Sequence, residues 1–331
     1  MAETLADVKI GTRGSKLALS QTRQITGQLS TVGGFAAEIV PIKTDGDILT
    51  GPLSQMGGTG VFAAELRAAI LDGRVDVAVH SLKDLPTAAV PGLTLAAVPV
   101  RADARDALCS RDGLKLAELP VGASIGTGSP RRAAQLLAAR PDLQIVDIRG
   151  NVDTRLGRVP GLPGNDVADP VPGKVADLDA VVLAAAGLTR IGRLDTVTEF
   201  QDTDVMLPAP GQGALALECR TADAGPTGVL GQSLAAVDDQ DTRLAVTAER
   251  ALLARLEAGC SAPVGALGHR KGSMLYLETV VVSLDGKRSL RLKKATDGLT
   301  VVAATLLGIE LAEELLAGGA ADLADLAGPA Q

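Results

Sequence analysis

The sequence predicts an α/β protein of two similar doubly wound domains, followed by a small α+β domain. Short apolar runs alternate with helix-period segments, the pattern of β-α units around a largely parallel sheet. One strand-turn-helix pattern occurs twice, as IGTRGSKLALSQ from Ile10 and as IGTGSPRRAAQL from Ile125, which indicates two similar domains. After about residue 241 the pattern changes to amphipathic helices and paired strands, which predicts the α+β domain.

The first β-α unit is residues 8–29, with a strand to Gly11, a turn, and a helix with Leu17, Leu19 and Ile25 available to the core. The run VDVAVHSLKDLP predicts a buried strand that ends near His80. Three further β-α units are expected, at residues 124–137, 143–156 and 178–192. The proline- and glycine-rich residues 159–174 predict a surface loop.

The C-terminal part begins with an amphipathic helix over residues 242–258, which Gly259 is expected to end. Residues 274–292 predict two strands joined at Asp285-Gly286, a favoured tight-turn pair. A final helix follows over residues 299–316.

Composition and charge exclude several classes of protein. A net charge of −7 and 1% aromatic residues disfavour a nucleic-acid binder, and no apolar run reaches the ~18 residues of a membrane span. With two histidines and three cysteines outside any metal-binding spacing, no metal site is expected. The cysteine usage and the lack of a secretory leader before Val8 predict a cytoplasmic protein without disulfides.

The segment GTGSPRR places two cations at a helix start. Ser129 suits the N-cap and Pro130 the first helical position, so Arg131 and Arg132 follow within the first turn. Positive charge at a helix N-terminus is unfavourable by ~0.3–1 kcal/mol per residue, whereas a bound carboxylate or phosphate reverses the sign. Thr127 and Ser129 add hydroxyls to such an anion site. The alternative is two solvated arginines.

Other polar residues also follow predicted strands: Arg13, Ser15, Lys83, Asp84, Arg149, Arg155 and Arg190. Because ligands of open α/β sheets bind beyond the carboxyl ends of strands, these side chains predict one cleft for a polyanionic ligand. Ordinary solubilising loop residues are the alternative. Asp84 is either a structural partner of a neighbouring cation or a carboxylate that stabilises a developing positive charge.

Cys260 occurs in a predicted turn, in LEAGCSAPVG. A lone cysteine is usually a small buried hydrophobe. Beside a basic cleft it would instead favour thiolate and covalent chemistry. Cys109, Cys219 and His80 fit structural roles.

Eight motifs in this order resemble the porphobilinogen deaminase (hydroxymethylbilane synthase) family: GTRGSKLAL, TDGD, HSLKDLPT, GTGSPRR, IRGNVDTRL, AAAGLTRIG, LPAPGQGALALECR and TAERALLARLEAGCSAPVGA. The similarity runs from about Ile10 to the last helix. It implies a transferase that condenses four porphobilinogen molecules into hydroxymethylbilane with loss of ammonia. It also implies a dipyrromethane cofactor bound through a thioether to Cys260.

The resemblance implies roles for the residues above. Asp84 matches the catalytic aspartate, which stabilises the azafulvenium-type cation formed when ammonia leaves. The cofactor is expected at Lys83, Asp84, Thr127, Ser129, Arg131 and Arg132, of which all but Asp84 would hold its carboxylates. The substrate or chain end is expected at Arg13, Ser15, Arg149, Arg155 and Arg190.

The resemblance further implies two periplasmic-binding-protein-like domains, at residues 1–100 with 214–234 and at residues 101–213, and a third domain at residues 235–331. A monomer is expected. Residues 44–60 match a loop near the cleft, and Phe62 matches the family. Many members have lysine where this chain has Thr59, so that position receives no binding role.

Two other functions remain open at this point. One is a non-catalytic anion-binding protein with the same two-domain cleft, because fold alone does not fix function. The other is an inactive homologue that binds the cofactor without elongating it. The combination of Cys260 with Asp84 favours the enzyme, since a simple anion binder needs neither.

Overall fold

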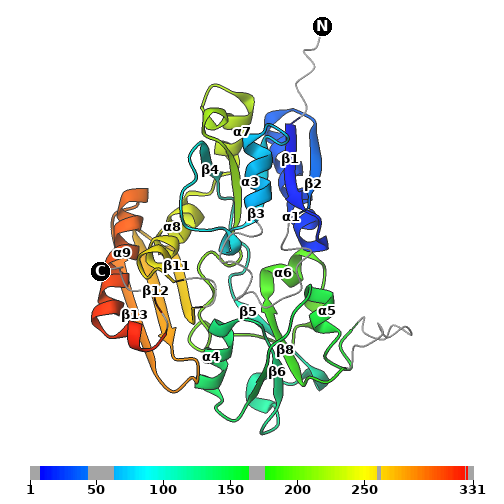
Figure 1. The fold of residues 1–331 in the computed structure, drawn as a ribbon, viewed down its shortest axis with the longest axis vertical. Helices are drawn as coiled ribbons and strands as arrows, with labels where there is room; N and C mark the ends of the chain where they lie inside the picture. The colour runs from blue at the N-terminus through cyan, green and yellow to red at the C-terminus, as the bar shows by residue number, and fades with distance from the viewer. Residues whose placement is uncertain (1–7, 44–62, 164–175, 259–261, 325, 327–331) are drawn as a thin grey trace.

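The computed structural model describes residues 8–43, 63–163, 176–258, 262–324 and 326 (Figure 1). In these ranges the strands form two five-stranded mixed sheets and one three-stranded antiparallel sheet. The two five-stranded sheets lie one above the other in Figure 1, and the three-stranded sheet lies beside them. The expected class is therefore confirmed: two α/β units and a small α+β unit. The expected largely parallel sheets are wrong, because two of the four strand pairs in each five-stranded sheet are antiparallel.

The first sheet has the strand order β2-β1-β3-β10-β4. β1 is parallel to β2 and β3, and β10 is antiparallel to β3 and β4. Its elements are β1 (Val8–Arg13), α1 (Lys16–Gly33), β2 (Ala37–Ile42), α3 (Ala64–Leu71), β3 (Val77–Ser81), the 3-10 turn η2 (Leu82–Asp84), β4 (Leu93–Ala97), β10 (Leu215–Arg220), η6 (Thr221–Ala224) and α7 (Val229–Val237).

The second sheet has the order β7-β6-β8-β5-β9, with β6 parallel to β7 and β8 and with β5 antiparallel to β8 and β9. Its elements are β5 (Asp106–Ser110), η3 (Arg111–Gly113), η4 (Leu116–Glu118), β6 (Ser124–Gly126), α4 (Pro130–Ala139), β7 (Gln144–Val146), α5 (Val152–Leu156), β8 (Ala180–Ala184), α6 (Ala185–Arg190), η5 (Leu194–Thr196) and β9 (Glu199–Phe200).

The repeated sequence pattern becomes the same structure in both sheets. β1 and β6 each occupy the second position, between two parallel neighbours. A serine caps the helix that follows: Ser15 Oγ accepts from the Ala18 N–H at 3.2 Å, and Ser129 Oγ accepts from the Arg132 N–H at 3.5 Å. The predicted helix start at Ser129-Pro130 is confirmed.

The third sheet has the order β11-β12-β13 and packs against α8 and α9. Its elements are α8 (Gln240–Arg255), β11 (Val264–Lys271), β12 (Met274–Val282), β13 (Ser289–Thr296), α9 (Val301–Ala317) and η7 (Ala320–Asp322). The hairpin turn falls at Asp285-Gly286 as expected, and Gly286 has a φ of 74°.

The predicted end of α8 at Gly259 is wrong. The helix ends at Arg255, and Glu257 takes the left-handed conformation with a φ of 49°. The reason is packing: the cap residue Leu256 is 1% exposed and lies in the core between α8, α9 and the third sheet. Burial of this leucine fixes where the chain turns, before the glycine is reached.

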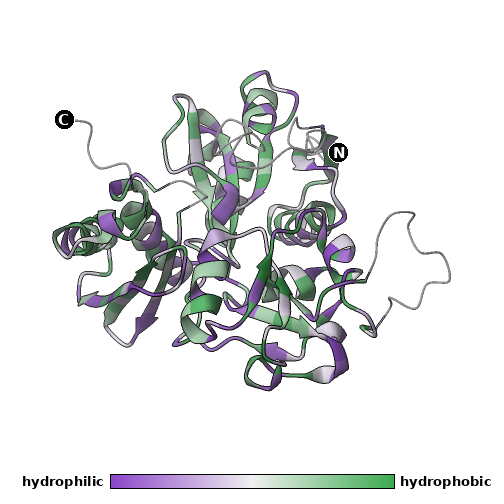
Figure 2. Cartoon of the chain, turned by 60° about the horizontal axis from the view of Figure 1, so that its bottom comes forward, coloured by the Kyte–Doolittle hydropathy of each residue, from purple (hydrophilic) through white to green (hydrophobic). Residues whose placement is uncertain are grey.

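Buried apolar side chains form a separate core around each sheet, and Figure 2 shows long green, apolar stretches along the inner strands. Two connecting segments, residues 98–105 and 201–214, join the first sheet to the second and back. Glu249 of α8 is fully buried against both, where it pairs with Arg101 at 2.6 Å and accepts from the Gly211 N–H at 2.6 Å. Within the described ranges, none of the helices combines the length and apolar character needed to cross a membrane.

Candidate active site

The predicted polar side chains lie at the carboxyl ends of the strands of the two α/β units. Arg13 ends β1, and Lys83 and Asp84 form η2 directly after β3. Thr127 and Ser129 join β6 to α4, and Arg190 ends α6 after β8. Contacts between the two units bring these ends together: Ser20 Oγ donates to the Arg190 carbonyl, and Lys16 pairs with Asp153 at 3.3 Å.

A small pocket of about 80 Å³ opens at the first sheet. Arg13, Ser15, His80 and Asp84 are among its lining residues. Asp84 is exposed, whereas the leucines on either side of the Lys83-Asp84 pair, Leu82 and Leu85, are buried. The carboxylate of Asp84 is therefore presented to the pocket by a turn that is anchored on both sides.

Arg131 and Arg132 are not solvated. They are 4% and 5% exposed, and both pair with Asp106, the first residue of β5, which is fully buried. Arg131 Nη1 lies 2.8 Å from Asp106 Oδ2, and Arg132 donates from Nε and Nη2 to Asp106 Oδ1 at 3.0 and 2.8 Å. Burial alone would raise the pKa of Asp106, but the two guanidinium groups hold it well below its ordinary value.

The sequence interpretation missed Asp106. The only signal was a carboxylate at the start of an otherwise apolar run, DALCS. It also gave no role to Gln212, whose amide donates to Asp106 Oδ1 at 2.9 Å and to the Ala104 carbonyl at 2.8 Å. Lys83 Nζ in turn donates to Gln212 Oε1 at 3.4 Å. Gln212 thus links the lysine of the first unit to the arginine pair of the second.

Burial lowers the pKa of Lys83 to about 8, an effect that Asp84 and Asp106 oppose and that Arg131 and Arg132 reinforce. The pKa of Arg155 is also lowered, first by burial and then by the neighbouring positive charges of Arg132 and Arg149. These shifts show that the predicted cations lie within electrostatic range of one another. The interacting groups are Lys83, Arg131, Arg132, Arg149 and Arg155 on one side and Asp84, Asp106 and Asp147 on the other.

Positive charge is therefore in excess at this edge. Arg131 Nε is buried and has no hydrogen-bond partner among the described residues. Burial lowers the pKa of Arg190 to about 10, and its Nη2 donates to the Gly213 carbonyl at 2.8 Å. Such an arrangement can bind a ligand with several carboxylates, because each charge-assisted hydrogen bond contributes ~1.5–3 kcal/mol.

The remaining predicted residues make local contacts. Thr127 is buried, and its hydroxyl accepts from the Ser129 N–H at 3.2 Å. Arg155 Nε donates to the Gly150 carbonyl at 2.8 Å, and Arg149 is exposed. Cys260, Thr59, Phe62, the 44–60 segment and most of the 159–174 segment lie outside the described residues.

The histidine and the other cysteines have structural surroundings. His80 Nε2 lies 3.2 Å from Glu218, which also accepts from Arg67 Nε at 3.1 and 3.0 Å. Cys109 and Cys219 are buried, and burial raises the pKa of each thiol to about 11. Among the described residues, no group of His, Cys, Asp or Glu side chains is arranged to hold a metal ion.

Two family models match the chain. Residues 8–226 match the model described as porphobilinogen deaminase, dipyromethane cofactor binding domain, and residues 243–317 match the C-terminal domain of porphobilinogen deaminase.

Curated relatives match over nearly their full length. The porphobilinogen deaminase of Cutibacterium acnes is 54% identical over 97% of this chain and 98% of the relative. The porphobilinogen deaminase of Micrococcus luteus is 51% identical over 96% of this chain and 94% of the relative. Among solved structures, a periplasmic substrate-binding protein of an ABC transporter from Coxiella burnetii covers 70% of this chain and 91% of its own, with a TM-score of 0.42 and 16% identity.

Proposed function

The chain belongs to the porphobilinogen deaminase family, and from that membership we propose how its residues perform the reaction. It is a transferase that condenses four porphobilinogen molecules into hydroxymethylbilane, with release of ammonia. Its cofactor is dipyrromethane. The single observation that carries the assignment of residues is the cluster in which Arg131 and Arg132 pair with buried Asp106 and Gln212 links Lys83 to the same carboxylate.

The residues fit a cofactor that carries several carboxylates. The cluster has excess positive charge and a buried guanidinium N–H, that of Arg131 Nε, without a partner among the described residues. Lys83, Arg131 and Arg132 would hold the carboxylates, with Thr127 and Ser129 beside them at the start of α4. When bound, the cofactor supplies a free pyrrole carbon on which the chain is built, and Cys260 would hold it covalently.

Asp84 would stabilise the positive charge that develops on the substrate when ammonia leaves. Its carboxylate is exposed and lines the pocket of the first unit, while Leu82 and Leu85 hold the backbone on either side. A fixed carboxylate stabilises developing charge without reorganisation at the moment of reaction. Arg13 and Ser15 line the same pocket and would bind the substrate carboxylates together with Arg149, Arg155 and Arg190.

We further propose that the three domains are residues 1–100 with 214–234, residues 101–213 and residues 235–331, since each range contains one of the three sheets. The last residues of α7, 235–237, go with the first domain, because Leu234 and Val237 pack in its core. We propose a cytoplasmic monomer. Gel filtration with light scattering tests the oligomeric state, and a dimer mass would contradict it. Fractionation of the native cell tests the location, and recovery outside the cytoplasmic fraction would contradict it.

The experiment that tests the cofactor assignment is intact mass spectrometry of the purified protein. A mass excess equal to two linked pyrroles is expected on the native chain and is expected to be absent from Cys260→Ser. Cys109→Ser and Cys219→Ser are matched controls, because both thiols are buried and should leave the mass excess in place.

Addition of porphobilinogen to the native protein should then add pyrrole units in steps. A native chain that stays unmodified after exposure to porphobilinogen would instead favour a non-catalytic anion-binding protein. A mass excess that persists in Cys260→Ser would remove Cys260 from the attachment site.

A further inference from the structure

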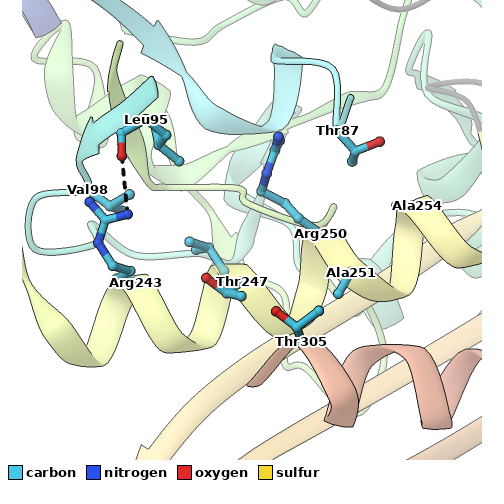
Figure 3. Close-up of a pocket in the computed structure, with 10 residues that line it drawn as sticks. Thr87, Leu95, Val98, Arg243, Thr247, Arg250, Ala251, Ala254 and Thr305 are labelled. Atoms are coloured by element: carbon cyan, nitrogen blue, oxygen red, sulfur yellow. Dashed lines mark hydrogen bonds between the residues drawn. The ribbon is translucent and has the colours of Figure 1, made fainter. Parts of the chain in front are cut away.

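The backbone that follows Asp84 is held by an arginine of the third unit. Arg250, on α8, donates from Nη1 to the Leu85 carbonyl and from Nη2 to the Pro86 carbonyl, both at 2.8 Å. Figure 3 shows its side chain extending from α8 toward the first unit. Residues 82–86 are called the Asp84 turn below. The two hydrogen bonds tie this turn to a helix that lies more than 150 residues later in the sequence.

Buried Leu82 and Leu85 anchor the Asp84 turn, and two backbone hydrogen bonds add to this. The Leu85 N–H donates to the Leu82 carbonyl within the turn, and the Leu82 N–H donates to the Ala214 carbonyl, both at 3.1 Å. Arg250 is half-buried. Burial and the neighbouring charge of Arg67 lower its pKa, while Glu218 opposes the shift. A forked donor that bonds two successive carbonyls fixes both the position and the direction of the backbone.

The same helix is fixed to the rest of the molecule at the neighbouring residue. Glu249 is fully buried and accepts from the Gly211 N–H at 2.6 Å and the Gly268 N–H at 2.7 Å, in addition to its pair with Arg101. α8 ends at Arg255, five residues before Cys260. The helix is thus anchored at the residue next to Arg250, and Cys260 follows its end in the sequence.

We propose that Arg250 is a positioning residue that fixes the Asp84 turn to α8, so that the Asp84 carboxylate keeps its place relative to the chain that carries Cys260. This inference rests on the roles proposed above for Asp84 and Cys260. Arg250 acts through the backbone of the turn and is assigned no contact with substrate. Misplacement of a catalytic group by about 1 Å can cost about 100-fold in rate, which sets the size of effect to look for.

The chain contains a matched control on the same helix. Arg243 also bonds two successive backbone carbonyls of the first unit, those of Leu95 at 3.3 Å and Ala96 at 3.0 Å, and pairs with Asp238 at 2.6 Å. Both arginines line one cavity of about 210 Å³ between α8, α9 and the first unit (Figure 3). A purely structural role for such bonds predicts similar consequences for the two arginines.

The test compares Arg250→Met with Arg243→Met in the cofactor-loaded enzyme, with loading measured by intact mass. We expect Arg250→Met to lower kcat by about 10-fold to 100-fold with little change in KM, and Arg243→Met to keep kcat within about 2-fold. Amide hydrogen exchange is the readout that does not depend on activity. It should increase in residues 82–87 for Arg250→Met and in residues 93–98 for Arg243→Met.

Arg250→Lys provides a second variant if Arg250→Met does not fold, because it keeps the charge but loses the fork. Its kcat is expected between the wild-type and Met values, with raised exchange in residues 82–87. Equal losses of kcat in the Arg250 and Arg243 variants, or unchanged exchange in residues 82–87, would overturn the proposal.

A double-mutant cycle with Asp84→Ala separates this inference from the proposed function. If Arg250 acts through Asp84, adding Arg250→Met to Asp84→Ala should lower kcat by no more than about 2-fold further. Full additivity of the two losses would overturn the positioning role. Near-normal turnover of Asp84→Ala would instead refute the role proposed for Asp84, whatever Arg250→Met does.

Discussion

Replacement of Asp106 by asparagine should destabilise the protein strongly, because within the described ranges Asp106 is the carboxylate that both buried arginines share. In the native structure Asp106 pairs with Arg131 at 2.8 Å, accepts twice from Arg132 and accepts from Gln212 at 2.9 Å. Asparagine has nearly the same size but carries no charge, so two guanidinium groups that are 4% and 5% exposed would lose their counterion.

Removal of one partner of a buried ion pair costs about 3–5 kcal/mol, since the remaining charge stays desolvated. At about 1.4 kcal/mol per tenfold change, Asp106→Asn should raise the unfolding equilibrium constant by roughly 10² to 10³-fold or more. The corresponding fall in Tm is roughly 13–21 °C if residues 101–213 unfold as one unit.

The assay is urea and thermal unfolding in a Cys260→Ser background, so that cofactor carboxylates cannot compensate for the lost charge. Asp103→Asn is the matched control. Asp103 lies three residues earlier and pairs with Arg105 at 2.7 Å, but its side chain is 34% exposed. An exposed pair contributes about 0–1 kcal/mol, so this control should unfold close to the wild type.

The pH dependence gives an independent check. The pKa of Asp106 is depressed in the folded protein relative to an ordinary 3.8, so its contribution to stability is present above that value and is lost as the pH falls below it. The difference in unfolding free energy between wild type and Asp106→Asn should therefore shrink as the pH falls from about 5 toward 2. A difference below about 1 kcal/mol at neutral pH would refute the assignment of Asp106 as the counterion of the pair.

Three further predictions follow from the same network. Asp84→Ala should lower turnover at least ~10²-fold with an unchanged Tm, and near-normal turnover would contradict its role. The rate of cofactor assembly by the cofactor-free chain should fall as the pH rises through about 8, where Lys83 loses its proton. Lys83→Arg should keep the rate constant over this pH range, because arginine stays charged. The same fall in rate in the wild type and in Lys83→Arg would exclude Lys83 as its cause. Glu249→Gln should cost about 3–5 kcal/mol in urea unfolding because Arg101 loses its buried partner, and a loss near zero would be inconsistent with the pairing.

Local signals in the sequence were sufficient for the elements of the fold. Ser129 and Pro130 mark the start of α4, and Asp285-Gly286 marks the hairpin between β12 and β13, because caps and tight turns depend on a few adjacent residues. The alternation of apolar runs with helical periods identified the two α/β units, and the repeated pattern after β1 and β6 identified their likeness. The motifs also identified the family.

The partners of the charged residues could not be predicted in this way. The sequence predicted that Arg131 and Arg132 form an anion site at a helix start, with solvated arginines as the alternative. Only the folded chain brings Asp106 to them from 25 residues away and Gln212 from about 80. The end of α8 was likewise decided by burial of Leu256 and not by the nearby glycine. The sequence by itself determined the local elements, the family and the set of cations; the tertiary structure decided which cations are paired, because ion pairing depends on distances between segments that no local pattern contains.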